Sequence, residues 1–497
     1  MGQSRKQAAH RPRRIIFNND GDDVVYYSKP APTAEEVLKL RTTPLLGSQV
    51  DTIFYSTTQG FPLFSHNTKV GEVFTCKEAM FADNVAGDLI AQGTDALQIM
   101  VDFCKKNRME LFWSMRMNDI HDAWGGDYSP YFFPKFKKDH PEYIMGTEND
   151  KPKHGGWTSV DYGEPEVREV AFGLIQEVCQ NYDVDGIEMD FFRHPMFFRR
   201  ASRGLPLGQE ELDVMTGLVR RVRETADWQG KKRGRPMLVA ARLPDSVQYC
   251  RGIGIDLETW LAEDLLDILV VTGYFQLSPW EHSVALGHGY DVPVYACLSE
   301  SRIPGEAGKA RNSDESYRAR AMNVWNAGAD GVYMFNLFDP HSPLWWELGD
   351  PETLARLDKV YFPTLRGGAD SAEFWLEGGA KLFNVPLLLP QDPLKLTPGT
   401  AESVSITVGD DPGRGMQPKV DLRLQVGNLA DAEAIVAAAN GMALAAGVLS
   451  GEWLEYAVEP HLVKRGENRL EITVRAGYDT PAMLRDVQLW VRYQTSS

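Results

Sequence analysis

Residues 182–195 read Tyr182-Asp-Val-Asp-Gly-Ile-Glu-Met-Asp190-Phe-Phe-Arg-His-Pro195. This pattern predicts a short strand that carries acidic side chains toward its C-terminal end. Side chains at positions i and i+2 of a strand share a face, so Glu188 and Asp190 point the same way, roughly 6–7 Å apart. Two carboxylates on the buried face of an apolar strand cost free energy unless they are paired or take part in chemistry. The stretch is therefore either an ordinary strand with a helix-capping Asp190 and an ion-paired Glu188, or part of a functional site.

Similar strands recur along the first two thirds of the chain. They are predicted at residues 14–18, 52–56, 110–117, 186–191, 237–243, 267–274, 292–298 and 331–338. Helical patterns lie between most of them, at residues 33–40, 94–106, 166–180, 209–227, 257–263 and 313–327. This alternation predicts a (β/α)₈ barrel. An open, doubly wound sheet is the rival fold, but no glycine-rich phosphate loop follows the first strand.

Polar side chains collect at the C-terminal ends of these strands, where the active sites of such barrels lie. Aromatic residues crowd the segment between Trp113 and Trp157. Aromatic faces stack on the apolar faces of sugar rings, while carboxylates, amides and guanidinium groups bind hydroxyls. The pattern predicts a carbohydrate substrate, and the residues expected to contact it are Asn18, Asp20, Trp113, Arg116, Asn118, Asp119, His121, Glu188, Arg193, Arg242, Tyr274 and Asn336.

The last part of the chain has a different pattern. Helical periodicity ends after Phe362, and a proline-rich run at residues 386–393 leads into alternating segments at 403–408, 421–426, 453–458, 469–474 and 485–493. Such segments predict a jelly-roll-like β-sandwich. The predicted domains are a barrel at residues 13–365 and a linker with the sandwich at residues 366–497. The sandwich serves either carbohydrate binding or structural support.

The motif Asp161-Tyr-Gly-Glu-Pro-Glu-Val-Arg-Glu169, followed by a helix and by Tyr182-Asp-Val-Asp-Gly-Ile187 with Asp190, resembles glycosyl hydrolase-like family 10. The resemblance covers about 35 residues closely and the rest of the barrel loosely. It implies a (β/α)₈ barrel from a group of carbohydrate-active enzymes. The same strand is also similar to that of chitinase-type barrels, but Phe192 stands where their catalytic Glu is found, which argues against their substrate-assisted mechanism.

Two carboxylates are predicted to form the catalytic pair. Hydrolysis through an oxocarbenium-like transition state needs one proton donor and one nucleophile or base. Many retaining barrels place one carboxylate after strand four and the other after strand seven, which selects Asp190 and Glu300. Asp119 is the reserve candidate, and Glu188 is expected to tune Asp190, because nearby like charges raise a pKa.

Two other function classes remain open. A metal-dependent hydrolase would normally have a His-x-His pair after strand one, where this chain has Asn and Asp. A non-catalytic carbohydrate-binding protein is the other alternative, which Phe192 keeps open. We expect no cofactor and no metal.

The bulk composition narrows the partners. A net charge of −17 disfavours nucleic-acid binding, and no apolar run is long enough to predict a transmembrane helix. The five cysteines form no CxxC pair. No signal-peptide pattern is apparent, the compartment stays open, and a homo-oligomer is compatible with the sequence.

Overall fold

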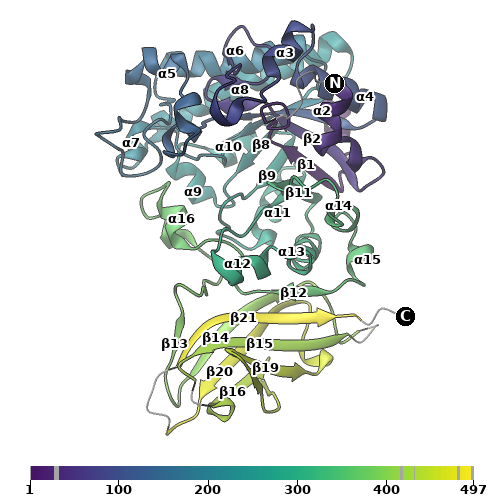
Figure 1. Ribbon diagram of the computed structural model, residues 1–497, viewed down its shortest axis with the longest axis vertical. Helices are drawn as coiled ribbons and strands as arrows, with labels where there is room; N and C mark the ends of the chain where they lie inside the picture. The colour runs from purple at the N-terminus through teal and green to yellow at the C-terminus, as the bar shows by residue number, and fades with distance from the viewer. Residues whose placement is uncertain (1, 27–32, 415–417, 430, 478–481, 494–497) are drawn as a thin grey trace. The chain divides into compact units, whose positions relative to one another are not determined.

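The first part of the chain forms a closed barrel of eight parallel strands with helices around it (Figure 1). The computed structural model describes residues 2–26, 33–414, 418–429, 431–477 and 482–493. The neighbouring strands pair in the order β1-β11-β10-β9-β8-β7-β6-β2, and β2 closes on β1. The barrel strands are β1 (Ile15–Asn19), β2 (Val50–Ser56), β6 (Glu110–Arg116), β7 (Gly186–Asp190), β8 (Leu238–Leu243), β9 (Ile268–Val271), β10 (Val294–Leu298) and β11 (Gly331–Phe335). Each predicted strand overlaps one of these, so the predicted (β/α)₈ barrel is confirmed.

The barrel strands are buried along almost their whole length, as expected for parallel strands covered on both faces. Gly186 opens β7 because no side chain fits there. A Cβ atom at this position would lie 2.3 Å from the ring of Phe112 and 2.7 Å from the carbonyl oxygen of Leu238. The Asp-Gly step in the sequence motif is therefore a packing requirement of β7 between its two neighbouring strands.

The helices begin and end at recognisable caps. Thr33 and Glu36 form a capping box at the start of α2 (Ala34–Arg41), and Asp95 caps α4 (Ala96–Asn107). Pro165 opens α6 (Pro165–Asn181), and the left-handed Gly234 ends α8 (Gln209–Arg233). The further helices of this unit include α10 (Leu257–Ala262) and α11 (Trp280–Gly289). The sequence did not predict α11.

One predicted strand is shorter than expected. The strand predicted at residues 267–274 ends at Val271, because Thr272 adopts a φ of +72°. A positive φ is rare for a β-branched residue and breaks the extended backbone. Asn336, directly after β11, also has a positive φ, of +58°.

The second part of the chain folds as a β-sandwich of two antiparallel sheets. One sheet has the order β12-β21-β15-β19-β18, with β13 (Leu394–Leu396) also paired to β21, and the other has the order β14-β20-β16-β17. Their strands are β12 (Lys359–Tyr361), β14 (Ala401–Val408), β15 (Lys419–Gly427), β16 (Ile435–Ala439), β17 (Met442–Ala443), β18 (Val448–Ser450), β19 (Trp453–Val458), β20 (Gly466–Val474) and β21 (Ala482–Arg492). Every strand predicted in this part is found, and the predicted sandwich is confirmed.

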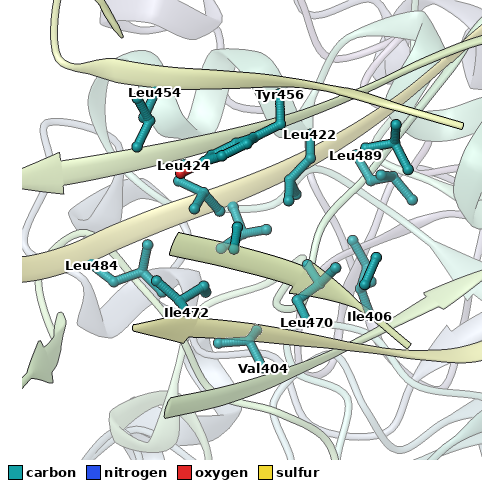
Figure 2. Close-up of a cluster of buried hydrophobic side chains, with 14 of the residues drawn as sticks. Val404, Ile406, Leu422, Leu424, Leu454, Tyr456, Leu470, Ile472, Leu484 and Leu489 are labelled. Carbon is teal, nitrogen blue, oxygen red and sulfur yellow. The ribbon is translucent and has the colours of Figure 1, made fainter. Parts of the chain in front are cut away.

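Alternating apolar side chains from both sheets fill the sandwich core. Figure 2 shows Val404 and Ile406 of β14, Leu422 of β15, and Leu470 and Ile472 of β20 among the buried residues. The alternation of buried and exposed positions along β14 and β20 is the pattern that predicted these strands.

The sandwich unit also contains segments from the barrel part of the sequence. By contacts, one unit comprises Met1–Ser299, Ala329–Trp345 and Ala369–Leu382, and the other comprises Glu300–Gly328, Trp346–Gly368 and Phe383–Ser497. Helices α12 (Gly305–Arg311) and α13 (Asp314–Asn326) thus group with the sandwich. Arg311 forms two hydrogen bonds with the carboxylate of Asp486, at 2.8 and 2.7 Å, and both side chains are buried. The predicted domain ranges, 13–365 and 366–497, stay a prediction.

Two searches of the described ranges gave no match. No helix in them is long and apolar enough to cross a membrane. Within the same ranges, no three His, Cys, Asp or Glu side chains are grouped so that they could hold a metal ion.

Candidate active site

A pocket of about 190 Å³ lies at the C-terminal ends of β1, β2, β6 and β7. Its walls come from the segments that directly follow these four strands. The lining residues are Asp20, Asp22, Tyr26, Gln59, Arg116, His121, Tyr128, Phe132 and Arg193. The structure therefore brings together four of the residues predicted to contact substrate, namely Asp20, Arg116, His121 and Arg193.

Two carboxyl groups in the pocket have opposite electrostatic environments. Arg41 binds Asp20 at 2.6 Å, and Arg116 lies 3.9 Å from the same carboxylate. Although burial alone would raise it, the pKa of Asp20 is lowered, because Arg41, Arg116 and Arg193 surround the group. Burial, and then the negative charge of Asp20, raise the pKa of Asp22 well above its usual value. At neutral pH the pocket thus holds an ionised Asp20 beside a protonated Asp22.

Asp119 lies behind the pocket and orients two of its lining side chains. Its carboxylate accepts from Arg116 at 3.1 Å and from Nδ1 of His121 at 2.7 Å. His121 accepts through Nε2 from Arg193 at 2.9 Å, which places the ring proton on Nδ1. Burial, and the neighbouring arginines, lower the pKa of His121 although Asp119 opposes this. The imidazole is therefore neutral.

Arg193 connects this network to the end of β9. Its Nη1 donates to the hydroxyl of Tyr274, and the guanidinium lies 5.4 Å from the ring centre of Phe335. Tyr274, a predicted substrate contact, is buried and holds Arg193 in place. Nε of Arg193 is buried and has no hydrogen-bond partner among the described residues.

The predicted catalytic residue Asp190 lies in the barrel, paired with another predicted site residue. Nε and Nη2 of Arg242 donate to the two oxygens of Asp190, at 2.9 and 2.7 Å. The amides of Phe192 and Arg193 also donate to Oδ1 of Asp190. Asp190 is 2% exposed and is not among the described residues that line the pocket.

Glu188 is buried in the barrel interior near this pair. Its Oε2 accepts from Ser114 at 2.5 Å and from the hydroxyl of Tyr333 at 3.0 Å, and Oε1 has no partner in the described structure. Burial, and then the charge of Asp190, raise the pKa of Glu188 to about 8. The expected electrostatic coupling of the two carboxylates is present, and it acts on Glu188.

Glu300, the second predicted catalytic residue, belongs to the unit that contains the sandwich. Its side chain is 50% exposed, and the Arg302 guanidinium lies 3.6 Å away. The assignment of Asp190 and Glu300 as the catalytic pair stays a prediction.

The remaining predicted contacts lie near the strand ends but do not line the pocket in the described structure. Asn18 donates to the carbonyl of Phe54 at 3.4 Å, and Asn118 donates to the carbonyl oxygens of Val160 and Met196. Trp113 is fully buried and its indole N–H donates to Thr57 at 2.8 Å. Asn336 is partly exposed at its left-handed position. Stability of the loops accounts for the contacts of Asn18, Asn118 and Trp113.

Sequence reasoning missed Asp22, Tyr26 and Gln59. Asp22 follows Asp20 by two residues at the end of β1, so the same rule that selected Asp20 could have found it. Gln59 lies in β3 (Thr58–Gly60), just after β2, at a strand end that the long insertion following it concealed. Tyr128 and Phe132 belong to the aromatic segment that the sequence linked to sugar stacking.

Comparisons with known proteins gave distant structural likenesses. No family model and no curated protein matches the chain. An α-L-fucosidase from Paenibacillus thiaminolyticus is 15% identical over 69% of this chain and 49% of its own, with a TM-score of 0.41. A cell-surface chitinase from Paenibacillus is 11% identical over 93% of this chain and 52% of its own, with a TM-score of 0.39.

A further likeness is to a family 36 α-galactosidase from Geobacillus stearothermophilus in complex with 1-deoxygalactonojirimycin. It is 10% identical over 93% of this chain and 56% of its own, with a TM-score of 0.36. The chain spans about half the length of these three structures. Membership of glycosyl hydrolase-like family 10 stays a prediction.

Proposed function

We propose that the pocket hydrolyses an O-glycosidic bond of an oligo- or polysaccharide, with Asp22 as the proton donor. The observation that carries this proposal is the pair of adjacent carboxyls, Asp20 and Asp22, whose pKa values are shifted in opposite directions. Such divergence assigns acid and base roles to two groups of the same type. A glycosidic oxygen leaves only when it is protonated, which requires an acid that keeps its proton near neutral pH.

Asp20 supplies the negative charge that the transition state needs. The sugar ring becomes positively charged as the bond to the leaving oxygen breaks, and an ionised carboxylate in a mostly buried pocket stabilises that charge. Arg41 keeps Asp20 ionised through its contact at 2.6 Å. Water is the acceptor of the sugar.

The rest of the pocket suits a sugar ring. Tyr26, Tyr128 and Phe132 contribute aromatic faces, while Arg116 and Gln59 contribute donors for hydroxyl groups. A volume of about 190 Å³ is below the roughly 300–1,000 Å³ of typical ligand pockets. We infer that the pocket takes one sugar ring at a time.

The competing assignment places catalysis on Asp190 and Glu300. The two assignments are separated by measuring hydrolysis of a panel of aryl glycosides and oligosaccharides with four variants: Asp20→Asn, Asp22→Asn, Asp190→Asn and Glu300→Gln. We expect Asp22→Asn to lower kcat by at least about 100-fold, the usual worth of a general acid, while Glu300→Gln keeps most of the activity.

Asp102→Asn is the matched control, because Asp102 lies on the exposed face of α4 and contacts only Gln98 among the described residues. Absence of hydrolysis across the panel would contradict the proposed function. Full activity in Asp22→Asn together with its loss in Glu300→Gln would instead support the competing pair.

A further inference from the structure

Three of the four arginine and histidine side chains around the pocket have their charge accounted for. Arg41 pairs with Asp20 at 2.6 Å, and Arg116 pairs with Asp119 at 3.1 Å. His121 is neutral, because it accepts from Arg193 and donates to Asp119. These two ion pairs use the two carboxylates that are ionised here, and Asp22 keeps its proton.

Arg193 is the exception. It is 9% exposed and lines the pocket, and none of the described Asp or Glu side chains lies within ion-pair distance of its guanidinium. Its described polar partners are a phenol, Tyr274, and a neutral imidazole, His121. An arginine stays charged at any physiological pH. A buried charge without a counter-ion is unfavourable, so the empty pocket contains a positive charge that a ligand can neutralise.

Two unused donors lie in the wall of the same pocket. Nε of Arg193 has no partner, and Nε2 of Gln59, a side chain that is 2% exposed, also has none among the described residues. Buried donors in native proteins are nearly always hydrogen-bonded. Both groups are donors, so the missing partner is an acceptor, and the charge on Arg193 favours an anionic acceptor.

We propose that the sugar bound in this pocket carries a carboxylate, as a uronic acid does, and that Arg193 and Gln59 bind it. This proposal rests on the proposed function only in taking the ligand to be a sugar. A planar carboxylate can accept from both donors at once, whereas a hydroxyl group would leave the guanidinium charge unbalanced. The chain has a net charge of −17, so long-range attraction does not favour an anionic ligand, and selection has to come from these local contacts.

Binding measurements test this without any turnover. Dissociation constants are measured by calorimetry for glucuronate, galacturonate and mannuronate, each against glucose, galactose and mannose as neutral parents. The 6-O-sulfates of the three sugars form a third arm, since a sulfate is also anionic. We expect at least one uronate to bind about ten-fold or more tightly than both its neutral parent and the matching sulfate.

Variants assign the effect to the two residues. Arg193→Met keeps the length of the side chain without its charge, and is expected to abolish the preference for the uronate. Arg193→Lys should restore part of it, and Gln59→Leu should reduce it several-fold. Thermal unfolding of each variant confirms that it is folded, and the wild-type comparison of uronate with neutral sugar stands without any variant.

Equal binding of uronates and neutral parents would overturn the proposal, as would a uronate preference that survives in Arg193→Met, or tighter binding of the sulfates. These outcomes are distinct from failure of the proposed function. A protein that binds uronates but hydrolyses no glycoside would refute the catalytic role and keep the carboxylate site. A protein that hydrolyses only neutral glycosides would do the reverse.

Discussion

Arg242 and Asp190 lie opposite each other on β8 and β7 and form a two-point ion pair inside the barrel. Arg242 is fully buried, and its guanidinium also lies 4.0 Å from the ring centre of Phe335. Two charges removed from water are stable only as a hydrogen-bonded pair. The pair therefore fixes the ends of two adjacent strands, just below the segments that build the pocket.

Removal of one partner should be costly for stability. We expect Arg242→Met to lower the free energy of unfolding by about 3–5 kcal/mol, because it leaves the Asp190 carboxylate buried without its counter-ion. Urea unfolding followed by circular dichroism measures this. Arg220→Met is the control, since Arg220 forms an exposed pair with Glu263 on the surface and should have a much smaller effect. Equal losses in both variants would show that the buried pair has no special role.

Glu188 should make the protein less stable as pH rises. Its pKa is about 8 in the folded protein and 4.5 as a free side chain. Between these values the folded state retains a proton that the unfolded state releases, so unfolding becomes easier with rising pH. The slope is at most about 1.4 kcal/mol per pH unit for one proton.

The variant Glu188→Gln carries no such proton and should flatten the decline in unfolding free energy between pH 4.5 and 8. Chemical unfolding at a series of pH values provides the measurement. An unchanged profile in Glu188→Gln would mean that Glu188 is ionised in the folded protein.

Asp20 should set the alkaline limit of activity. Asp22 has to be protonated to act as an acid, so activity is lost as pH rises through its pKa. Asp20→Asn removes the neighbouring negative charge, which lowers the pKa of Asp22 and moves the alkaline limb of the kcat profile to lower pH. The profile of Asp102→Asn should match that of the wild type. A shift to higher pH in Asp20→Asn would refute the assignment of the acid.

Gly186→Ala should destabilise the barrel. The added Cβ atom would contact a backbone carbonyl of β8 and the Phe112 ring at less than 3 Å, and the carbonyl cannot move without disturbing the strand pairing. We expect a loss of about 1–3 kcal/mol in unfolding free energy, as for overpacked cores. Gly217→Ala in α8 is the matched control, because nothing lies within 4 Å of a Cβ atom there, and it should be neutral or stabilising.

The sequence predicted the fold well because buried parallel strands are continuous apolar runs. It missed β16, whose Ala-rich stretch at residues 435–439 has low strand propensity. It also gave β9 three extra residues, since the left-handed backbone of Thr272 has no sequence signal of its own.

The site was harder to predict than the fold. The rule that polar residues follow barrel strands found Asp20, Arg116, His121 and Arg193. It could not separate pocket residues from ion pairs, because the partner of Asp190 depends on the register between β7 and β8. Asp190 and Arg242 were both expected at the site, whereas the structure pairs each with the other.

The interleaving of the two units along the chain limits how this protein can be modified or can have evolved. Helix α13, which follows β10 in sequence, groups with the sandwich, where Asn323 donates to Thr407 and Asn326 donates to Gly409. A cut at residue 365 would strip residues 369–382 from the barrel unit and separate α13 from both acceptors. Neither unit is a cassette that recombination could exchange intact, so we expect the barrel and sandwich to have been inherited together.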